Sequence, residues 1–160
     1  MQPEIKKLND TKLTGMKITM SFAQNRTTEL WKIFMPKRKH INHQIGTDLF
    51  SVEIFKDADF LKNFNPNQTF EKWAAVQVHE CDAIPESMET LVIPEGFYAV
   101  FQYKGKASDA PEMYQYIFGN WLPKSEYVLD NRPHFALMGD KYKNEDPNSE
   151  EELWIPIKRK

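Results

Sequence analysis

The chain has 160 residues, 41% of them hydrophobic, which is enough for one compact domain and too little for a multidomain enzyme. Its 21 Lys and Arg nearly balance 23 Asp and Glu, giving a net charge of -2, and no long basic run breaks the balance. Proteins that bind DNA or RNA through phosphates normally have a basic excess, so we expect no direct nucleic-acid binding.

The single cysteine, Cys81, cannot form an intramolecular disulfide, and it excludes a disulfide scaffold or a cysteine-rich zinc site. No run approaches the roughly 18 apolar residues of a membrane span, and the N-terminal residues MQPEIKKLND lack the apolar core of a signal peptide. We therefore expect a cytoplasmic protein without membrane contact, present as a monomer or weak homodimer.

The first half of the chain reads as strand, helix, strand, strand. Alternating apolar and polar residues predict a strand over 15–20. Helical spacing predicts a helix that Thr27 or Thr28 can cap and that ends in the Lys-rich stretch around Pro36 to Lys39. Two further strands are expected over 49–55 and 72–78, with a polar turn between them.

The second half has the same order. Its clearest strand begins at Gly96 and continues through the alternating sequence FYAVFQY. Pro111 is placed to open a helix that ends by Pro123. Strands over 134–139 and 151–157 follow, separated by a turn-rich segment.

The two halves share residues in the same order, at offsets of about 81 to 85 positions. Chance supplies one such match easily, whereas four in chain order favour an internal duplication. The prediction is one domain, 1–160, with repeat halves at about 12–80 and 92–158. We expect an α+β fold of two β-α-β-β units, related by a pseudo-twofold axis, in an antiparallel sheet with helices on one face. The matches are Gly15 with Gly96, Ile33-Phe34 with Ile117-Phe118, Phe50 with Phe135, and Glu71-Lys72-Trp73 with Glu152-Leu153-Trp154.

Strand alternation places a carboxylate and an indole on one face in both copies: Glu71 with Trp73, and Glu152 with Trp154. This face is opposite the main aliphatic stripe, so it predicts a ligand groove at the axis, lined by rings and acids. Such a groove suits a hydrophobic, cationic or amphipathic small molecule, because ring faces attract cations. The alternative is that each Glu is solvated and each Trp packs at a sheet edge.

Other candidates are less specific. Tyr98 lies opposite the main apolar stripe of its strand, where it could face the groove, and Trp121 ends a helical stripe, where it could reach a pocket between sheet and helix. For both, core packing is the alternative. His40 and His43 have no carboxylate or Cys at matching spacing, so we expect no metal site. No phosphate-binding glycine motif occurs, and we expect no cofactor.

Four segments are distinctive in order and spacing: IPEGFYAVFQYKG (Ile93 to Gly105), YIFGNWLPKSEY (Tyr116 to Tyr127), RPHFALMGD (Arg132 to Asp140) and EELWIPIK (Glu151 to Lys158). Together they resemble the GyrI-like, AraC-type bacterial effector-binding domain family. The resemblance implies a ligand groove between the halves, with the pocket carboxylate of the family's E-x-x-I-P strand at Glu152. It also implies an aromatic lining, carried over to Trp154, Trp121, Tyr98, Phe135 and Trp73. In the family a strand often carries an acid and a Tyr where this chain has Ala136, Leu137 and Met138.

Three functions are compatible with these features. The first is small-molecule binding by a stand-alone effector-binding protein, linked to transcription regulation or drug sensing, since only some eleven residues precede the first repeat half. The second is hydrolysis, since some proteins of the family are similar to hydrolases that open strained electrophilic rings. Glu152 and Tyr98 would then act together in general acid–base catalysis. The third is a gyrase-inhibitor-like module that binds a protein.

Overall fold

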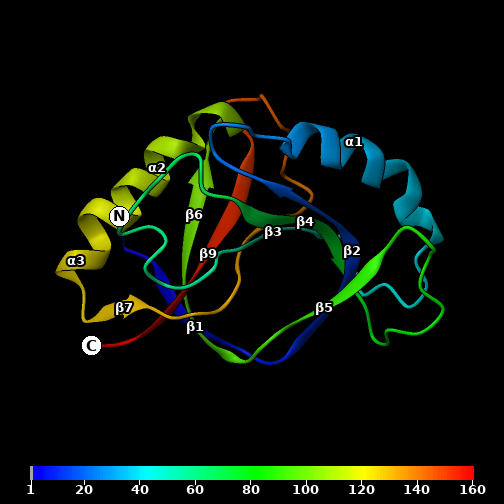
Figure 1. Ribbon diagram of the computed structural model, residues 1–160, viewed down its shortest axis with the longest axis horizontal. Coiled ribbons are helices and arrows are strands. Elements are labelled where there is room, and N and C mark those ends of the chain that lie inside the picture. The colour runs from blue at the N-terminus through cyan, green and yellow to red at the C-terminus, as the bar shows by residue number, and fades with distance from the viewer. Residues whose placement is uncertain (1) are drawn as a thin grey trace.

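A computed structural model describes residues 2–160, which form an antiparallel sheet with helices on one face (Figure 1). This confirms the expected α+β class. The strands are β1 (Glu4–Leu8), β2 (Thr11–Met20), β3 (Leu49–Ile54), β4 (Phe70–Gln77), β5 (Glu89–Ile93), β6 (Gly96–Lys104), β7 (Tyr127–Leu129), β8 (His134–Met138) and β9 (Glu150–Arg159).

The strand order is symmetric about its centre. It runs β1-β6-β9-β8-β3-β4-β2-β5, while β7 pairs with the end of β9. The two halves meet where β3 pairs with β8. Outward from this pair, β4 corresponds to β9 and β2 corresponds to β6, as a pseudo-twofold axis between β3 and β8 requires.

The sheet closes on itself through two long strands. β1 and β2 together form one of them, and β5 and β6 form the other. The two pair in a single continuous register: Leu8 lies opposite Gly96 and, three residues on, Thr11 lies opposite Ile93. Only two residues separate β1 from β2, and two separate β5 from β6. The closed sheet therefore has an inner face, with β1 and β5 on the side away from the helices (Figure 1).

The helices cover the outer face. Helix α1 (Thr27–Lys37) is followed by η1 (Arg38–His40) and packs Leu30 and Phe34 against Ala74 and Val76 of β4. In the second half, η2 (Ala107–Asp109) leads into α2 (Ala110–Tyr116), and η3 (Ile117–Trp121) and α3 (Leu122–Lys124) follow without a break. Figure 1 shows both helical groups on the same side of the sheet.

Three strands, β1, β5 and β7, were not predicted, and β2 begins at Thr11 rather than at residue 15. The repeat register also differs from the simple sequence match. Trp73 lies opposite Lys17, and Trp154 lies opposite Val100. The two Trp are 81 positions apart in the sequence, whereas the residues opposite them are 83 positions apart. Gly15 and Gly96 are therefore not equivalent when the two Trp are superposed.

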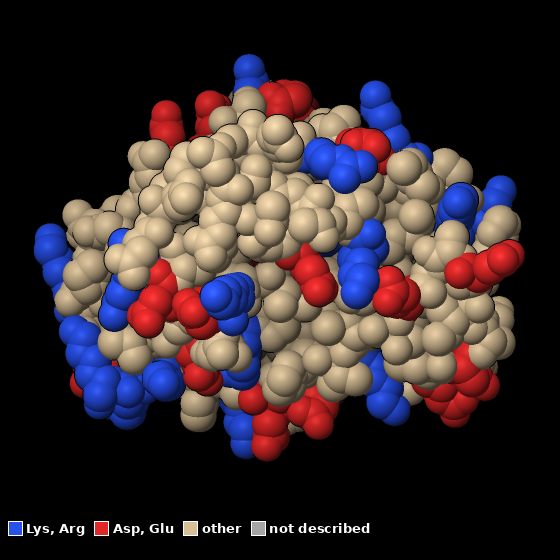
Figure 2. Space-filling view, viewed as in Figure 1, with Lys and Arg blue, Asp and Glu red and all other residues tan. Residues whose placement is uncertain are grey.

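Charged side chains of both signs are interspersed over the face drawn in Figure 2, in keeping with the near-neutral composition. Among residues 2–160, no helix is long and apolar enough to cross a membrane.

Candidate functional site

Four of the six predicted site residues form one aromatic cluster on the inner face. Trp73 of β4, Tyr98 of β6, Phe135 of β8 and Trp154 of β9 are all buried there. The Phe135 and Trp154 rings stack with centroids 5.1 Å apart, and Tyr98 lies 5.4 Å from Phe135 and 5.7 Å from Trp154. Each ring comes from a different strand, so the fold brings together positions up to 81 residues apart.

The two Glu–Trp pairs predicted from alternation have the same geometry. The indole Nε1 of Trp73 donates to Oε1 of Glu71 at 3.1 Å, and Nε1 of Trp154 donates to Oε1 of Glu152 at 3.1 Å. In the second copy, Gln102 Nε2 donates to the other oxygen of Glu152 at 2.9 Å. A half-buried carboxylate thus lies next to a buried indole in each repeat.

Each of these indoles already has an ammonium group near its ring face. Lys6 Nζ lies 5.8 Å from the ring centroid of Trp154, and Lys17 Nζ lies 5.7 Å from that of Trp73. Both lysines are partly exposed, and each is also within 3.6 Å of a glutamate, Glu4 or Glu89. The rim of the cluster is therefore a place where a cation can meet a ring face and water at once.

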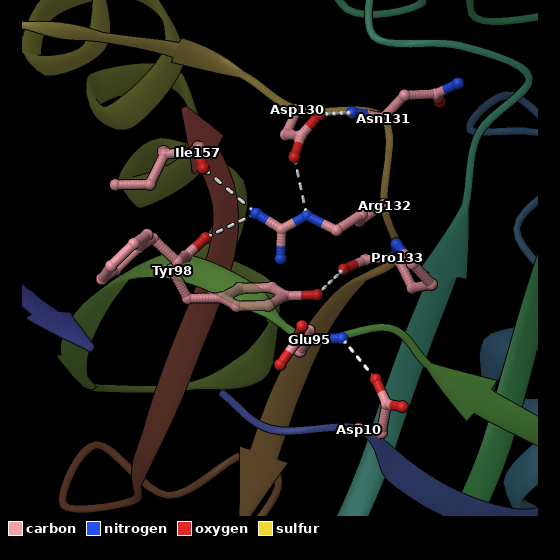
Figure 3. Close-up of polar contacts among 9 residues, drawn as sticks. Asp10, Glu95, Tyr98, Asp130, Asn131, Arg132, Pro133 and Ile157 are labelled. Atoms are coloured by element: carbon pink, nitrogen blue, oxygen red, sulfur yellow. Dashed lines mark hydrogen bonds and ion pairs between the residues drawn. The ribbon is translucent and has the colours of Figure 1, made fainter. Parts of the chain in front are cut away.

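Tyr98 is fixed by a network centred on Arg132 (Figure 3). Its hydroxyl donates to the carbonyl oxygen of Pro133 at 2.7 Å, and the Arg132 guanidinium lies over its ring, 4.8 Å from the centroid. Burial raises the pKa of Tyr98 well above its ordinary value. Arg132 Nη2 donates to the carbonyls of Phe97 and Ile157, and Nε donates to Asp130.

This network bears on the predicted hydrolase pair. The Tyr98 hydroxyl is bonded to a backbone carbonyl, while both oxygens of Glu152 accept hydrogen bonds from Trp154 and Gln102. Within residues 2–160, these hydrogen bonds join Tyr98 and Glu152 to other residues and not to each other. A general acid–base pair needs both groups within reach of one reacting atom, so this arrangement does not favour the hydrolase hypothesis.

Trp121 is not part of the cluster. It lies on the outer face, where its ring packs edge-on against Phe101 at 5.1 Å and lies 6.4 Å from Tyr127. One side of it borders a shallow surface hollow that also contains Ile5. The structure does not bring Trp121 together with the other four rings, because its helix and the cluster lie on opposite faces of the sheet. Its role as a ligand contact stays a prediction.

Sequence reasoning missed Glu151. As the neighbour of Glu152 on β9, it projects to the outer face with Leu153, and burial raises its pKa to about 7, although Lys72 opposes that rise. Also on this face, burial lowers the pKa of His134 to about 3, with a smaller contribution from Arg132. The signal was readable, because Glu151 falls in the aliphatic stripe of Leu153, Ile155 and Ile157.

Comparison with known proteins agrees with this architecture. The transcriptional regulator BrlR of Pseudomonas aeruginosa is 27% identical over 146 residues, covering 91% of this chain and 51% of BrlR, so the chain spans about half the length of that relative. The structure of SAV2435 bound to tetraphenylphosphonium matches with a TM-score of 0.72 and 16% identity over 99% of this chain and 94% of the other. The EcmrR C-terminal domain matches with a TM-score of 0.69 and 17% identity over 99% and 98%.

These two structural similarities show a common fold. A family model described as a GyrI-like small molecule binding domain matches residues 1–158, nearly the whole chain. With its duplicated, closed sheet and its inner aromatic cluster, the chain belongs to the GyrI-like small molecule binding domain family.

Proposed function

We propose that this chain binds hydrophobic cations over the inner aromatic cluster, with Glu152 and Trp154 as the principal contacts. The observation that carries the proposal is the Lys6 ammonium, which lies 5.8 Å from the Trp154 ring centroid while the indole N–H is bonded to Glu152. A place that accepts an ammonium group from the protein has the electrostatics to accept one from a ligand.

The pseudo-twofold axis provides a second, similar place. Glu71, Trp73 and Lys17 have the corresponding arrangement, with an N–H bond of 3.1 Å and a ring-to-ammonium distance of 5.7 Å. A ligand with several aromatic rings around one charge is suited to a cluster with rings at its centre and a carboxylate at each end. Most of its binding free energy comes from burying apolar area, and the carboxylates select for the charge.

The test is titration calorimetry with tetraphenylphosphonium, an aromatic cation that has been seen bound to SAV2435. The expected effect of Glu152→Gln is a loss of affinity of about 5- to 100-fold, because a carboxylate that faces a cation is replaced by a neutral amide. Glu150→Gln is the matched control, since Glu150 is on the same strand and no indole is bonded to it.

A neutral aryl compound, triphenylphosphine oxide, separates charge from shape. It should bind wild type and Glu152→Gln alike. Equal affinity of both proteins for the phosphonium, or equal losses in the two Gln variants, would refute the assignment of Glu152.

A further inference from the structure

Three metal-ligating side chains from two distant loops meet at one corner of the molecule. His43 lies in the loop after η1, and Glu80 and Asp82 follow β4. One ligand atom from each lies within 4.8 Å of the other two, and His43 Nε2 is 2.9 Å from Asp82 Oδ1. All three residues are exposed. This corner is remote in sequence from the Glu152 strand and plays no part in the proposed cation site.

Backbone hydrogen bonds hold the two loops together. His79 N donates to His43 O at 2.9 Å, and Ile45 N donates to Gln77 O at 2.8 Å. Between them, Gln44 and Val78 form an isolated antiparallel bridge. The three ligands therefore belong to a fixed pair of segments, and only their side chains need to move.

The orientation of the two acids follows from the residue between them. Cys81 is half-buried and packs against the apolar cluster beneath α1. Because Cys81 turns inward, Glu80 and Asp82 are both left exposed on the side where His43 lies. Two residues at this corner, His43 with φ of 66° and Ala83 with φ of 50°, are the non-glycine residues with positive φ within residues 2–160.

We propose that His43, Glu80 and Asp82 bind a divalent transition-metal ion of the zinc type. One imidazole and two carboxylates are ligands that zinc accepts at bond lengths of about 2.0 to 2.2 Å, with water completing the coordination. Tetrahedral ligand atoms then lie about 3.4 Å apart. The ligand atoms of His43, Glu80 and Asp82 now lie within 4.8 Å of one another, so small side-chain movements would bring them to this spacing. The ion would then replace the direct contact between His43 and Asp82. The imidazole favours Zn²⁺, Ni²⁺ or Co²⁺ over Ca²⁺ and Mg²⁺, which prefer oxygen ligands throughout.

The test uses the full chain without a histidine tag, freed of metal with a chelator and titrated with ZnCl2 by calorimetry. We expect one ion per chain with a dissociation constant below about 100 µM. Co²⁺ provides an independent readout through its visible absorption. Zn²⁺ should also raise the melting temperature, because the folded state brings the three ligands together and so binds the ion more tightly than the unfolded chain.

The matched variants are His43→Asn and His40→Asn. Asparagine tolerates the left-handed backbone of residue 43, so the fold should be kept, and circular dichroism checks it. His43→Asn and Asp82→Asn should each weaken Zn²⁺ binding at least 10-fold, while His40→Asn, an exposed histidine outside the trio, should bind as wild type does. Binding weaker than about 100 µM, or equal losses in the His43 and His40 variants, would overturn the proposal.

Discussion

At the scale of single residues, Glu151 and Glu152 show how much the face of a strand decides. Both are glutamates on β9, yet Glu152 accepts hydrogen bonds from Trp154 and Gln102 at the inner face. Glu151 is directed to the outer face, where burial raises its pKa to about 7. Neighbouring carboxylates of identical chemistry therefore have different surroundings, and in our proposal only Glu152 meets a ligand.

The raised pKa of Glu151 predicts a pH dependence of stability. Between pH 4.5 and 7 the folded chain keeps a proton that the unfolded chain releases, so the free energy of unfolding falls as pH rises through this window. His134, with its pKa lowered to about 3, acts in the opposite sense between pH 6.5 and 3, because the unfolded chain takes up the proton there.

Glu151→Gln should remove the first contribution and leave the second. Wild type loses stability as pH rises from 4 to 8, and the variant lacks this loss. The free energy of unfolding of the variant minus that of wild type should therefore increase by about 1 to 3 kcal/mol from pH 4 to pH 8. Urea titrations across this range measure it. Glu150→Gln, at a half-buried position on the same strand, is the control. Parallel pH profiles of Glu151→Gln and wild type would contradict the prediction.

The lysines over the indoles predict a gain in ligand affinity, provided that cations bind at the inner cluster. Lys6→Met removes an ammonium that competes for the Trp154 ring face, so tetraphenylphosphonium should bind about 2- to 5-fold more tightly. Lys7→Met is the matched control, because it changes net charge equally at an exposed position on the same strand. Calorimetry distinguishes them, and equal effects of both variants would show that only net charge matters.

At the scale of elements, the predicted strands were those with a strong apolar alternation. β1, with the sequence EIKKL, is short and mostly exposed, and its pattern alone does not distinguish it from a polar terminus. It is a strand because β6 offers it a free edge. β5 and β7 arise in the same way, from pairing with β2 and β9. Such pairings depend on partners far away in the chain, which local periodicity does not report.

Arg132 connects several of these elements, and its loss should be costly. Its side chain is 9% exposed and joins the carbonyls of Phe97 in β6 and Ile157 in β9 to Asp130. Arg132→Met would remove the guanidinium donor from both carbonyls and from Oδ2 of Asp130, whose Oδ1 keeps its bond from Asn131 N. We expect a loss of about 3 to 5 kcal/mol in the free energy of unfolding by urea titration.

Arg159→Met is the comparison for that measurement, because Arg159 is exposed and its ion pair with Glu126 is 3.8 Å long. That variant should lose less than about 1 kcal/mol. If both arginines cost the same, the network in Figure 3 does not contribute as argued.

At the scale of the whole molecule, the sequence was informative about symmetry. The repeated Glu–Trp pairs predicted two equivalent strands, and β4 and β9 are those strands. Four of the predicted rings come together for the same reason, since alternation on equivalent strands directs them to one face. What could not be predicted is closure of the sheet and the position of Trp121, because both depend on how the layers pack around the axis.

Closure also constrains how the chain can fold during synthesis. β1 and the first half of β2 pair with residues 89–100, so these contacts join positions about half the chain apart. Until a ribosome has released β6, the N-terminal strand lacks its partner and the inner face stays open to water. Pairings at such sequence separation slow folding, and we expect refolding in the range of about milliseconds to seconds. The nascent first repeat exposes Trp73 and the neighbouring apolar side chains in that interval, which makes it the stage at which a chaperone would be most useful to this protein.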